Sequence, residues 1–240
     1  GKYDSVAFKK SVGLNGVGTK AVNALSSWFR VAAFRDGKTV EAEFSRGELL
    51  KESKQRSTNK KNGTEVEYIP DEDIFRNFRY RIGLVEERVW NYAFLNPGLT
   101  LEVNGKKIQS ENGLLDLLGR YVDDSLRYPI VHLKGEDIEI AFTHCASYGE
   151  HYYSFVNGQH TTEGGTHLAA FREGLVKGVR DHFKKDYDPS DIRASIIGSI
   201  SIRIQEPVFE SQTKNKLGST EVVPGGAKLR SWIVDFVSKE

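Results

Sequence analysis

The chain has no methionine and only one cysteine, Cys145, among its 240 residues. A single thiol cannot form an internal disulfide, and it cannot build a thiolate metal centre, so disulfide-stabilised scaffolds and zinc fingers are excluded. The six histidines show neither the H-E-x-x-H nor the H-x-x-E-H spacing of zinc hydrolases. We therefore expect no metal site within the chain and a reducing compartment.

A strong net charge and a long apolar segment are also missing. Lys and Arg total 34 against 33 for Asp and Glu, which leaves a formal charge of +1. No overall field attracts nucleic acid, so a basic contact surface would have to be local. There is no signal peptide and no apolar run that could cross a bilayer, and we therefore expect a cytoplasmic protein without a membrane partner.

The beginning of the sequence lacks the character of a folded element. Residues 1–12 are polar and rich in lysine, and they carry no continuous apolar run of the kind found in a buried strand. Together with the missing methionine, this predicts that the chain is a fragment excised from a longer protein. Its length still allows two domains, each with a core of its own.

Three glycines, Gly13, Gly16 and Gly18, directly precede a predicted helix. Glycine lets the backbone approach a ligand closely, and the free amides of a first helical turn attract anions, so the stretch predicts a phosphate site. An ordinary turn before a helix has the same composition. A P-loop is excluded because Thr19 and Lys20 stand in the wrong order for Gly-Lys-Ser/Thr.

A dinucleotide site is the competing interpretation of the same stretch. Residues 16–21 match G-x-G-x-x-A, and Asp36 follows about twenty residues later. A nicotinamide-dependent oxidoreductase would use Gly16 to Ala21 and Asp36, and it would need a buried parallel strand directly before Gly16. The polar residues 1–12 speak against that strand.

Hydrophobic periodicity predicts the elements of a first unit. Apolar and polar residues alternate over a β-hairpin, with a turn at Asp36-Gly37. The predicted elements are the hairpin at 29–44, a polar loop at 51–62, a strand at 63–71, a helix at 84–95, a short hairpin around Asn104-Gly105 and a helix at 114–121.

The character of the sequence changes at Pro129, which predicts a domain boundary near residue 125. The predicted elements after it are strands at 138–142, 152–156 and 200–204, a long amphipathic helix at 165–183, a polar loop at 205–220 and a closing helix at 229–236.

Two loops are unusually dense in polar residues and glycine. Residues 157–167 hold three glycines beside hydroxyl and amide side chains, and residues 212–218 set Lys214 and Lys216 beside Gln212. Taken alone, the first is explained more simply as a capped helix start, and the second as a solvated basic loop. A lysine at a loop tip is nevertheless the right point charge for a terminal phosphate, and a neighbouring amide can orient one oxygen.

Three long stretches carry a resemblance to a known family. Residues 13–18 with 22–26, then 162–168, then 209–218 occur in this order and at similar separations in the B subunits of bacterial type IIA topoisomerases, gyrase and topoisomerase IV. The resemblance covers essentially the whole chain. It implies the C-terminal part of a GHKL ATPase α/β sandwich over residues 1–124, beginning in the ATP lid, and a ribosomal-S5-like transducer domain over residues 125–240.

The resemblance also assigns site residues, each at its matching position. Gln212 and Lys214 match the catalytic pair that senses the γ-phosphate, and Thr64 matches a threonine on the floor of the adenine pocket. Lys2 and Lys9 stand where the family places lysines that neutralise phosphate, and Phe8 stands where many members have a tyrosine near the adenosine. The residues that would surround the triphosphate are Gly13, Leu14, Asn15, Gly16, Val17, Gly18 and Thr19.

The implied cofactors are ATP and Mg²⁺, and the implied function is to couple ATP binding and hydrolysis to DNA strand passage. The implied partners are the topoisomerase A subunit in an A2B2 assembly, double-stranded DNA, and a second B subunit upon ATP binding. The family's general base and magnesium ligand lie upstream of the lid, so the fragment alone is predicted to be inactive. A non-catalytic nucleic-acid-binding module built on the second half, and the oxidoreductase, are the alternatives.

Overall fold

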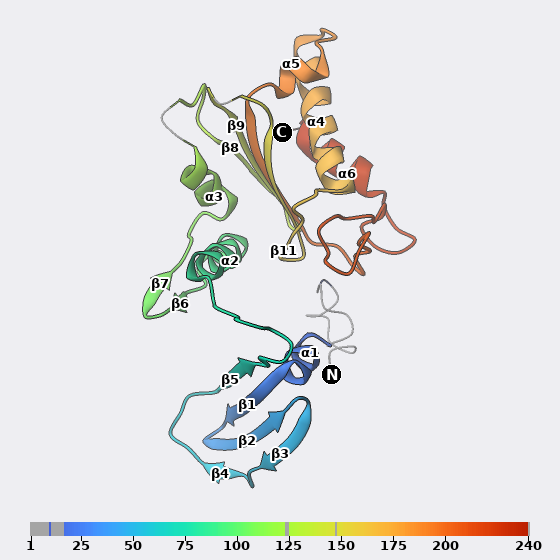
Figure 1. The fold of residues 1–240 in the computed structure, drawn as a ribbon. Helices are drawn as coiled ribbons and strands as arrows, with labels where there is room; N and C mark the ends of the chain where they lie inside the picture. The colour runs from blue at the N-terminus through green and yellow to red at the C-terminus, as the bar shows by residue number, and fades with distance from the viewer. Residues whose placement is uncertain (1–9, 11–16, 123–124, 147, 240) are drawn as a thin grey trace. The chain divides into compact units, whose positions relative to one another are not determined.

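A computed structural model describes residues 10, 17–122, 125–146 and 148–239. Its contacts divide the chain into two compact units (Figure 1). One unit comprises residues 13–81, and the other comprises residues 82–240.

The unit of residues 13–81 is one short helix beside an antiparallel sheet. Its elements are α1 (Gly18–Ala24), β1 (Ser26–Arg35), β2 (Lys38–Ser45), β3 (Glu48–Glu52), β4 (Arg56–Ser57) and β5 (Gly63–Pro70). The strands lie in the order β3-β2-β1-β5, and β4 pairs with β2. The predicted hairpin is confirmed, because Phe29 of β1 pairs with Phe44 of β2. Asp36 and Gly37 form its turn with φ angles of 51° and 74°, as a two-residue hairpin turn requires.

The predicted loop over residues 51–62 is partly wrong, because β3 ends within it and β4 lies inside it. Both strands are exposed along their whole length. An edge strand with solvent on both faces lacks the apolar alternation on which the prediction depended.

The sheet of residues 13–81 has a charged face and an apolar face. On the charged face, the guanidinium of Arg30 donates to the carboxylate of Glu41 over 2.7 Å and also pairs with Glu67. The hydrogen bond from Arg30 lowers the pKa of Glu41. The apolar face carries Phe29 of β1 and, opposite it on β5, Tyr68; Val66 on the same face is 48% exposed.

The unit that includes residues 82–240 is built around a five-stranded mixed sheet. Its elements are α2 (Ile82–Leu95), β6 (Leu101–Val103), β7 (Lys106–Ile108), α3 (Leu114–Tyr121), β8 (Val131–Lys134), β9 (Ile138–His144), β10 (His151–Val156), β11 (Gln159–His160), α4 (Thr166–Phe183), α5 (Pro189–Arg193), β12 (Ile196–Ile202) and α6 (Leu229–Lys239). The strand order is β11-β10-β12-β9-β8. The β10 and β12 strands are parallel, and the other pairs are antiparallel.

Helices cover both faces of this sheet (Figure 1). Ile200 of β12 faces the core made with α4 and α6, where Phe171 and Ile233 are fully buried. Ile197 of the same strand lies in a second core with Leu117 of α3 and the end of α2. Alternate side chains of a strand point to opposite faces, so β12 joins the two cores into three layers.

The α3 helix is fixed to the sheet at its amino end. Glu139 of β9 accepts the backbone N–H of Leu114 over 2.8 Å and lies 2.9 Å from the His132 ring. A carboxylate that accepts a first-turn amide caps a helix and is favoured there by the helix dipole. The predicted helix at 114–121 is confirmed without change.

The long predicted helix is confirmed as α4, and α6 packs closely against it. A Cβ built at Gly174 of α4 would lie 2.9 Å from the Cβ of Val237 of α6, so glycine is what allows the two backbones to approach. Phe171 and Leu175 are buried on the predicted stripe, but Phe183 at its end is exposed. The predicted strand at 200–204 begins earlier, at Ile196, and ends at Ile202.

Candidate functional site

The α1 helix presents its amino end without an internal partner. Val17 precedes the helix, no side chain among the described residues caps it, and its first turn has no acidic residue. The first helical hydrogen bond runs from the N–H of Ala21 to Val17 over 2.9 Å. Val17, Gly18 and Thr19 are exposed, and their side of the helix offers backbone amides to an anion.

The carboxyl end of α1 is held by the sheet. The Leu25 carbonyl accepts the N–H of Asp71 over 3.0 Å, and the Ser26 carbonyl accepts the N–H of Arg46 over 2.8 Å. Arg46 also donates to the buried Asp71 carboxylate over 2.5 Å and lowers its pKa. The helix is therefore anchored at one end and presented at the other.

Thr64, the residue matched to the adenine pocket, lies on the apolar face of the same sheet. It pairs with Ala33, whereas Pro70 at the other end of β5 pairs with Ser26, directly after α1. At about 3.3 Å a residue, Thr64 lies roughly 20 Å along β5 from the α1 end. Seven further predicted residues lie outside the described part of the chain: Lys2, Phe8, Lys9, Gly13, Leu14, Asn15 and Gly16.

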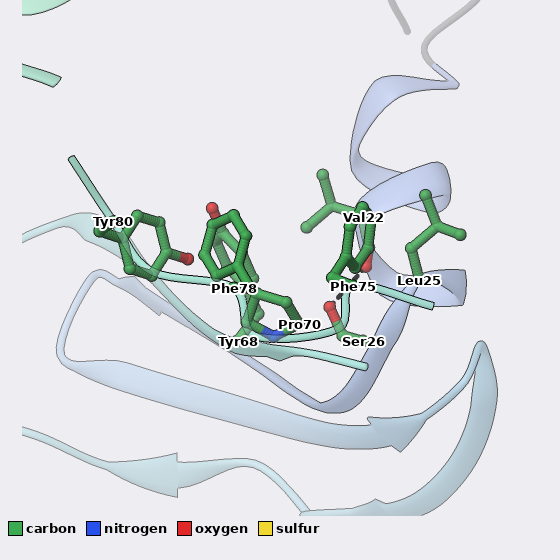
Figure 2. A pocket seen from close by; sticks show the side chains of 8 residues that line it. All are labelled: Val22, Leu25, Ser26, Tyr68, Pro70, Phe75, Phe78 and Tyr80. Carbon is green, nitrogen blue, oxygen red and sulfur yellow. Dashed lines mark hydrogen bonds between the residues drawn. The ribbon is translucent and has the colours of Figure 1, made fainter. Parts of the chain in front are cut away.

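An aromatic pocket of about 160 Å³ lies beside α1 (Figure 2). It is lined by Val22, Leu25, Ser26, Tyr68, Pro70, Phe75, Phe78 and Tyr80. The Phe78 and Tyr80 rings meet edge to face, with centroids 4.8 Å apart, and burial raises the pKa of the Tyr80 hydroxyl to about 12. The lining offers no positive charge at neutral pH, so this pocket suits apolar groups and not a phosphate.

Gln212 and Lys214 lie together at the tip of the loop between β12 and α6. The N–H of Lys214 donates to the Ser211 carbonyl over 3.0 Å and closes a tight turn. Lys214 has a φ of 58°, an uncommon value for a residue with a side chain. Gln212 is exposed and Lys214 is partly buried. The two residues predicted to act as a pair are therefore presented by one turn.

A short neck below this tip joins the loop to the start of α4. Phe209 and Leu217 pair across the neck, and the N–H of Glu210 donates to Lys216 over 3.1 Å. Leu217 is buried and forms a parallel bridge with Gly165. The polar loops of residues 157–167 and 212–218 are thus in contact. The sequence interpretation missed Leu217, although a lone leucine in a polar stretch was the available signal.

His167, the second residue of α4, is fully buried. Its Nε2 lies 3.1 Å from the Thr161 hydroxyl, which also bonds Ser154. Among the residues that the structure describes, Nδ1 finds no hydrogen-bond partner. Burial lowers the pKa of His167 to about 3, so the ring is neutral near pH 7. The ring therefore has a structural role at the start of α4 and is not accessible to solvent.

The dinucleotide interpretation is wrong. The strands of residues 13–81 are antiparallel throughout, whereas a dinucleotide fold binds its ligand at the ends of parallel strands. Asp36 stands in an exposed hairpin turn and receives a hydrogen bond from Asn62. Asp36 follows the carboxyl end of β1, whereas α1 precedes the amino end of that strand, so Asp36 is not placed beside Gly18.

The described part of the chain offers neither a metal centre nor a membrane span. No group of three His, Cys, Asp or Glu side chains there is arranged to hold a metal ion. No described helix is both long enough and apolar enough to span a membrane.

Comparison with known families decides the relationship. The profile of the family described as DNA gyrase B matches residues 102–234, more than half of the chain. The chain belongs to the DNA gyrase B family. The predicted resemblance to type IIA topoisomerase B subunits is thereby confirmed, and the alternative of an unrelated nucleic-acid-binding module has no support.

Individual members of the DNA gyrase B family resemble nearly all of the chain. The B subunit of DNA topoisomerase 4 from Borreliella burgdorferi is 48% identical over 95% of this chain and 38% of its own length. The B subunit of DNA gyrase from Thermotoga maritima is 34% identical over 92% of this chain and 39% of its own length. The chain thus spans somewhat over a third of these relatives.

A solved structure supports the predicted α/β fold class. The crystal structure of the 43K ATPase domain of Thermus thermophilus gyrase B, in complex with an aminocoumarin, is 25% identical with a TM-score of 0.70. The match covers 96% of this chain and 68% of that domain.

Proposed function

We propose that the chain is the part of an ATP-dependent type II DNA topoisomerase B subunit that contacts the phosphates of ATP and couples hydrolysis to DNA strand passage. The observation that carries the proposal is the turn bearing Gln212 and Lys214, fixed to α4 in a chain of the DNA gyrase B family. The Thermus thermophilus relative is named as an ATPase domain, which supports ATP as the nucleotide.

The site residues have distinct proposed roles. The exposed amino end of α1, with Val17, Gly18 and Thr19, binds the triphosphate through backbone amides, and its lack of acidic residues fits an anion. Thr64 lies at the other end of β5, as expected if it contacts the base end of the nucleotide. Lys214 neutralises the γ-phosphate, and Gln212 orients one of its oxygens.

The wider assembly follows from the same proposal. We infer that residues 1–124 belong to the ATPase domain and residues 125–240 to the transducer domain. The intact protein works with a topoisomerase A subunit in an A2B2 assembly, acts on double-stranded DNA, and pairs with a second B subunit upon ATP binding. Magnesium accompanies the ATP phosphates. Bacterial DNA lies in the cytoplasm, which is where we expect the enzyme to work.

The test is Lys214→Ala in the intact protein assembled with its A subunit. A charge-assisted hydrogen bond to phosphate contributes about 1.5–3 kcal/mol. ATP turnover and supercoil relaxation should therefore fall by about ten- to a hundredfold, whereas the affinity for ADP, which lacks the γ-phosphate, should not change.

Lys216→Ala is the matched control. Lys216 lies two residues away and pairs with Glu210 over 3.0 Å at an exposed site, and exposed pairs contribute little to stability. Its turnover should stay near that of the wild type. Supercoil relaxation by Lys214→Ala at the wild-type rate would refute the assigned role.

A further inference from the structure

The loop tip that presents Gln212 and Lys214 has a rigid base. The N–H of Gly218 donates to the Val208 carbonyl over 2.9 Å, and the N–H of Val208 donates to the Ser219 hydroxyl over 2.8 Å. With the Phe209–Leu217 bridge, these bonds form a short ladder over residues 208–210 and 216–219. The tip cannot change its direction without moving this neck ladder.

The first residues of α4 hold the neck ladder from the other side. The N–H of Leu217 donates to the Gly164 carbonyl over 3.0 Å, and the N–H of Thr166 donates back to the Leu217 carbonyl over 3.1 Å. The Thr166 hydroxyl then donates to the Ser219 carbonyl over 2.6 Å. The N–H and the carbonyl of Leu217 are therefore both bonded to the segment that opens α4, on the edge opposite Phe209.

Gly165 allows this approach and admits no side chain. Its φ is 128°, and a Cβ built there would lie 2.3 Å from the Leu217 carbonyl oxygen and 2.5 Å from the Leu217 nitrogen. Those atoms are backbone, so they cannot turn away as a flexible side chain could. A methyl group at residue 165 would push the neck ladder off α4.

We propose that Gly165 and Thr166 are positioning residues for the γ-phosphate pair, because they fix the neck ladder, and with it Gln212 and Lys214, to α4. The inference rests on the proposed function of Lys214 and adds to it the elements through which that lysine is held. Neither residue touches the nucleotide. Through this junction, a force on Lys214 reaches α4, whose Phe171 and Leu175 pack in the core of the unit.

The experiment compares Thr166→Val with Thr166→Ser in the intact protein assembled with its A subunit. Valine keeps the shape of threonine but loses the hydroxyl, and serine retains the hydroxyl. One hydrogen bond corresponds to about a fivefold effect. We expect Thr166→Val to lower kcat for ATP about fivefold with unchanged ADP affinity, and Thr166→Ser to restore it.

A double-mutant cycle separates positioning from a general structural effect. If Thr166 acts through Lys214, adding Thr166→Val to the Lys214→Ala variant should not lower kcat for ATP any further. A full fivefold loss in that background would overturn the inference. Hydrogen exchange at the Leu217 amide should also be faster in Thr166→Val than in the wild type, and an unchanged rate would overturn the inference too.

Thr161→Val is the matched control variant. Thr161 lies five residues before Thr166, and its hydroxyl bonds Ser154 and His167 inside the unit, not a residue of the neck ladder. It should lose stability and retain kcat. If Lys214→Ala slows turnover while Thr166→Val does not, the inference fails and the proposed function stands. If Lys214→Ala has no effect, both fail.

Discussion

The buried ring of His167 makes the stability of its unit dependent on pH. Its pKa falls from 6.5 to about 3 because the ring is buried. Between these values the unfolded chain binds a proton that the folded chain does not, so acid favours unfolding. The stability is fully present above pH 6.5 and is lost as the pH falls toward 3.

The size of the effect follows from the linkage relation. From pH 8 to pH 5, His167 alone should remove about 2 kcal/mol of unfolding free energy, and at pH 4 about 3 kcal/mol. Carboxylates titrate in the same range, so the wild type by itself cannot isolate this contribution. His167→Gln removes the titrating ring and keeps a polar group that can reach Thr161.

Hydrogen exchange of amides in β10 and α4 measures the free energy of the unit that contains His167. At pH 8, His167→Gln should be less stable than the wild type because the packing of the ring is lost. At pH 5 the difference in unfolding free energy between His167→Gln and the wild type should be about 2 kcal/mol smaller than at pH 8. Thr166→Val, which loses a hydrogen bond without a titrating group, should show no such narrowing. A gap between His167→Gln and the wild type that is equal at the two pH values would refute the argument.

Two further predictions concern stability. Glu139→Ala removes the acceptor for the Leu114 amide and should lower the unfolding free energy, measured by urea denaturation, by about 1 kcal/mol. Glu139→Gln keeps an acceptor, so its unfolding free energy should fall by less. Equal losses of unfolding free energy in the two variants would contradict the capping role. Phe171→Ala leaves a cavity at a fully buried site between Phe142 and Tyr152. It should lower the unfolding free energy, measured in the same way, by about 3–5 kcal/mol. A decrease below about 1 kcal/mol would contradict the assignment of Phe171 to the core.

Elements with one buried face were predictable from the sequence. The long helix was predictable from an apolar stripe that includes Phe171 and Leu175, and β9 from the alternation that includes Ile138 and Ile140. Both elements have such a pattern because one face of each packs in a core. The β3 and β4 strands were not predictable, since exposed edge strands have no apolar side. The helix predicted at 84–95 is confirmed as α2, but its buried residues, Ala93, Phe94 and Leu95, all lie at its carboxyl end.

The candidate site was predictable only as separate stretches. Gln212 and Lys214 were found by resemblance, and their common turn agrees with a shared role. The contact between Gly165 and Leu217 was not predictable, because a glycine before a helix reads as a simple turn. Only the distance to the Leu217 backbone shows that this glycine is required.

The close contact between Gly174 and Val237 has a mechanical consequence. Helices packed this closely have little room to slide past each other, so we expect α4 and α6 to move as one body. The segment that carries Lys214 leads directly into α6, where the N–H of Leu229 donates to Thr220 over 3.0 Å. The same segment is also bonded to the start of α4, at Gly164 and Thr166. The loop that carries Lys214 is thus bonded to the amino ends of both helices, and we expect a displacement of its tip to act on α4 and α6 together.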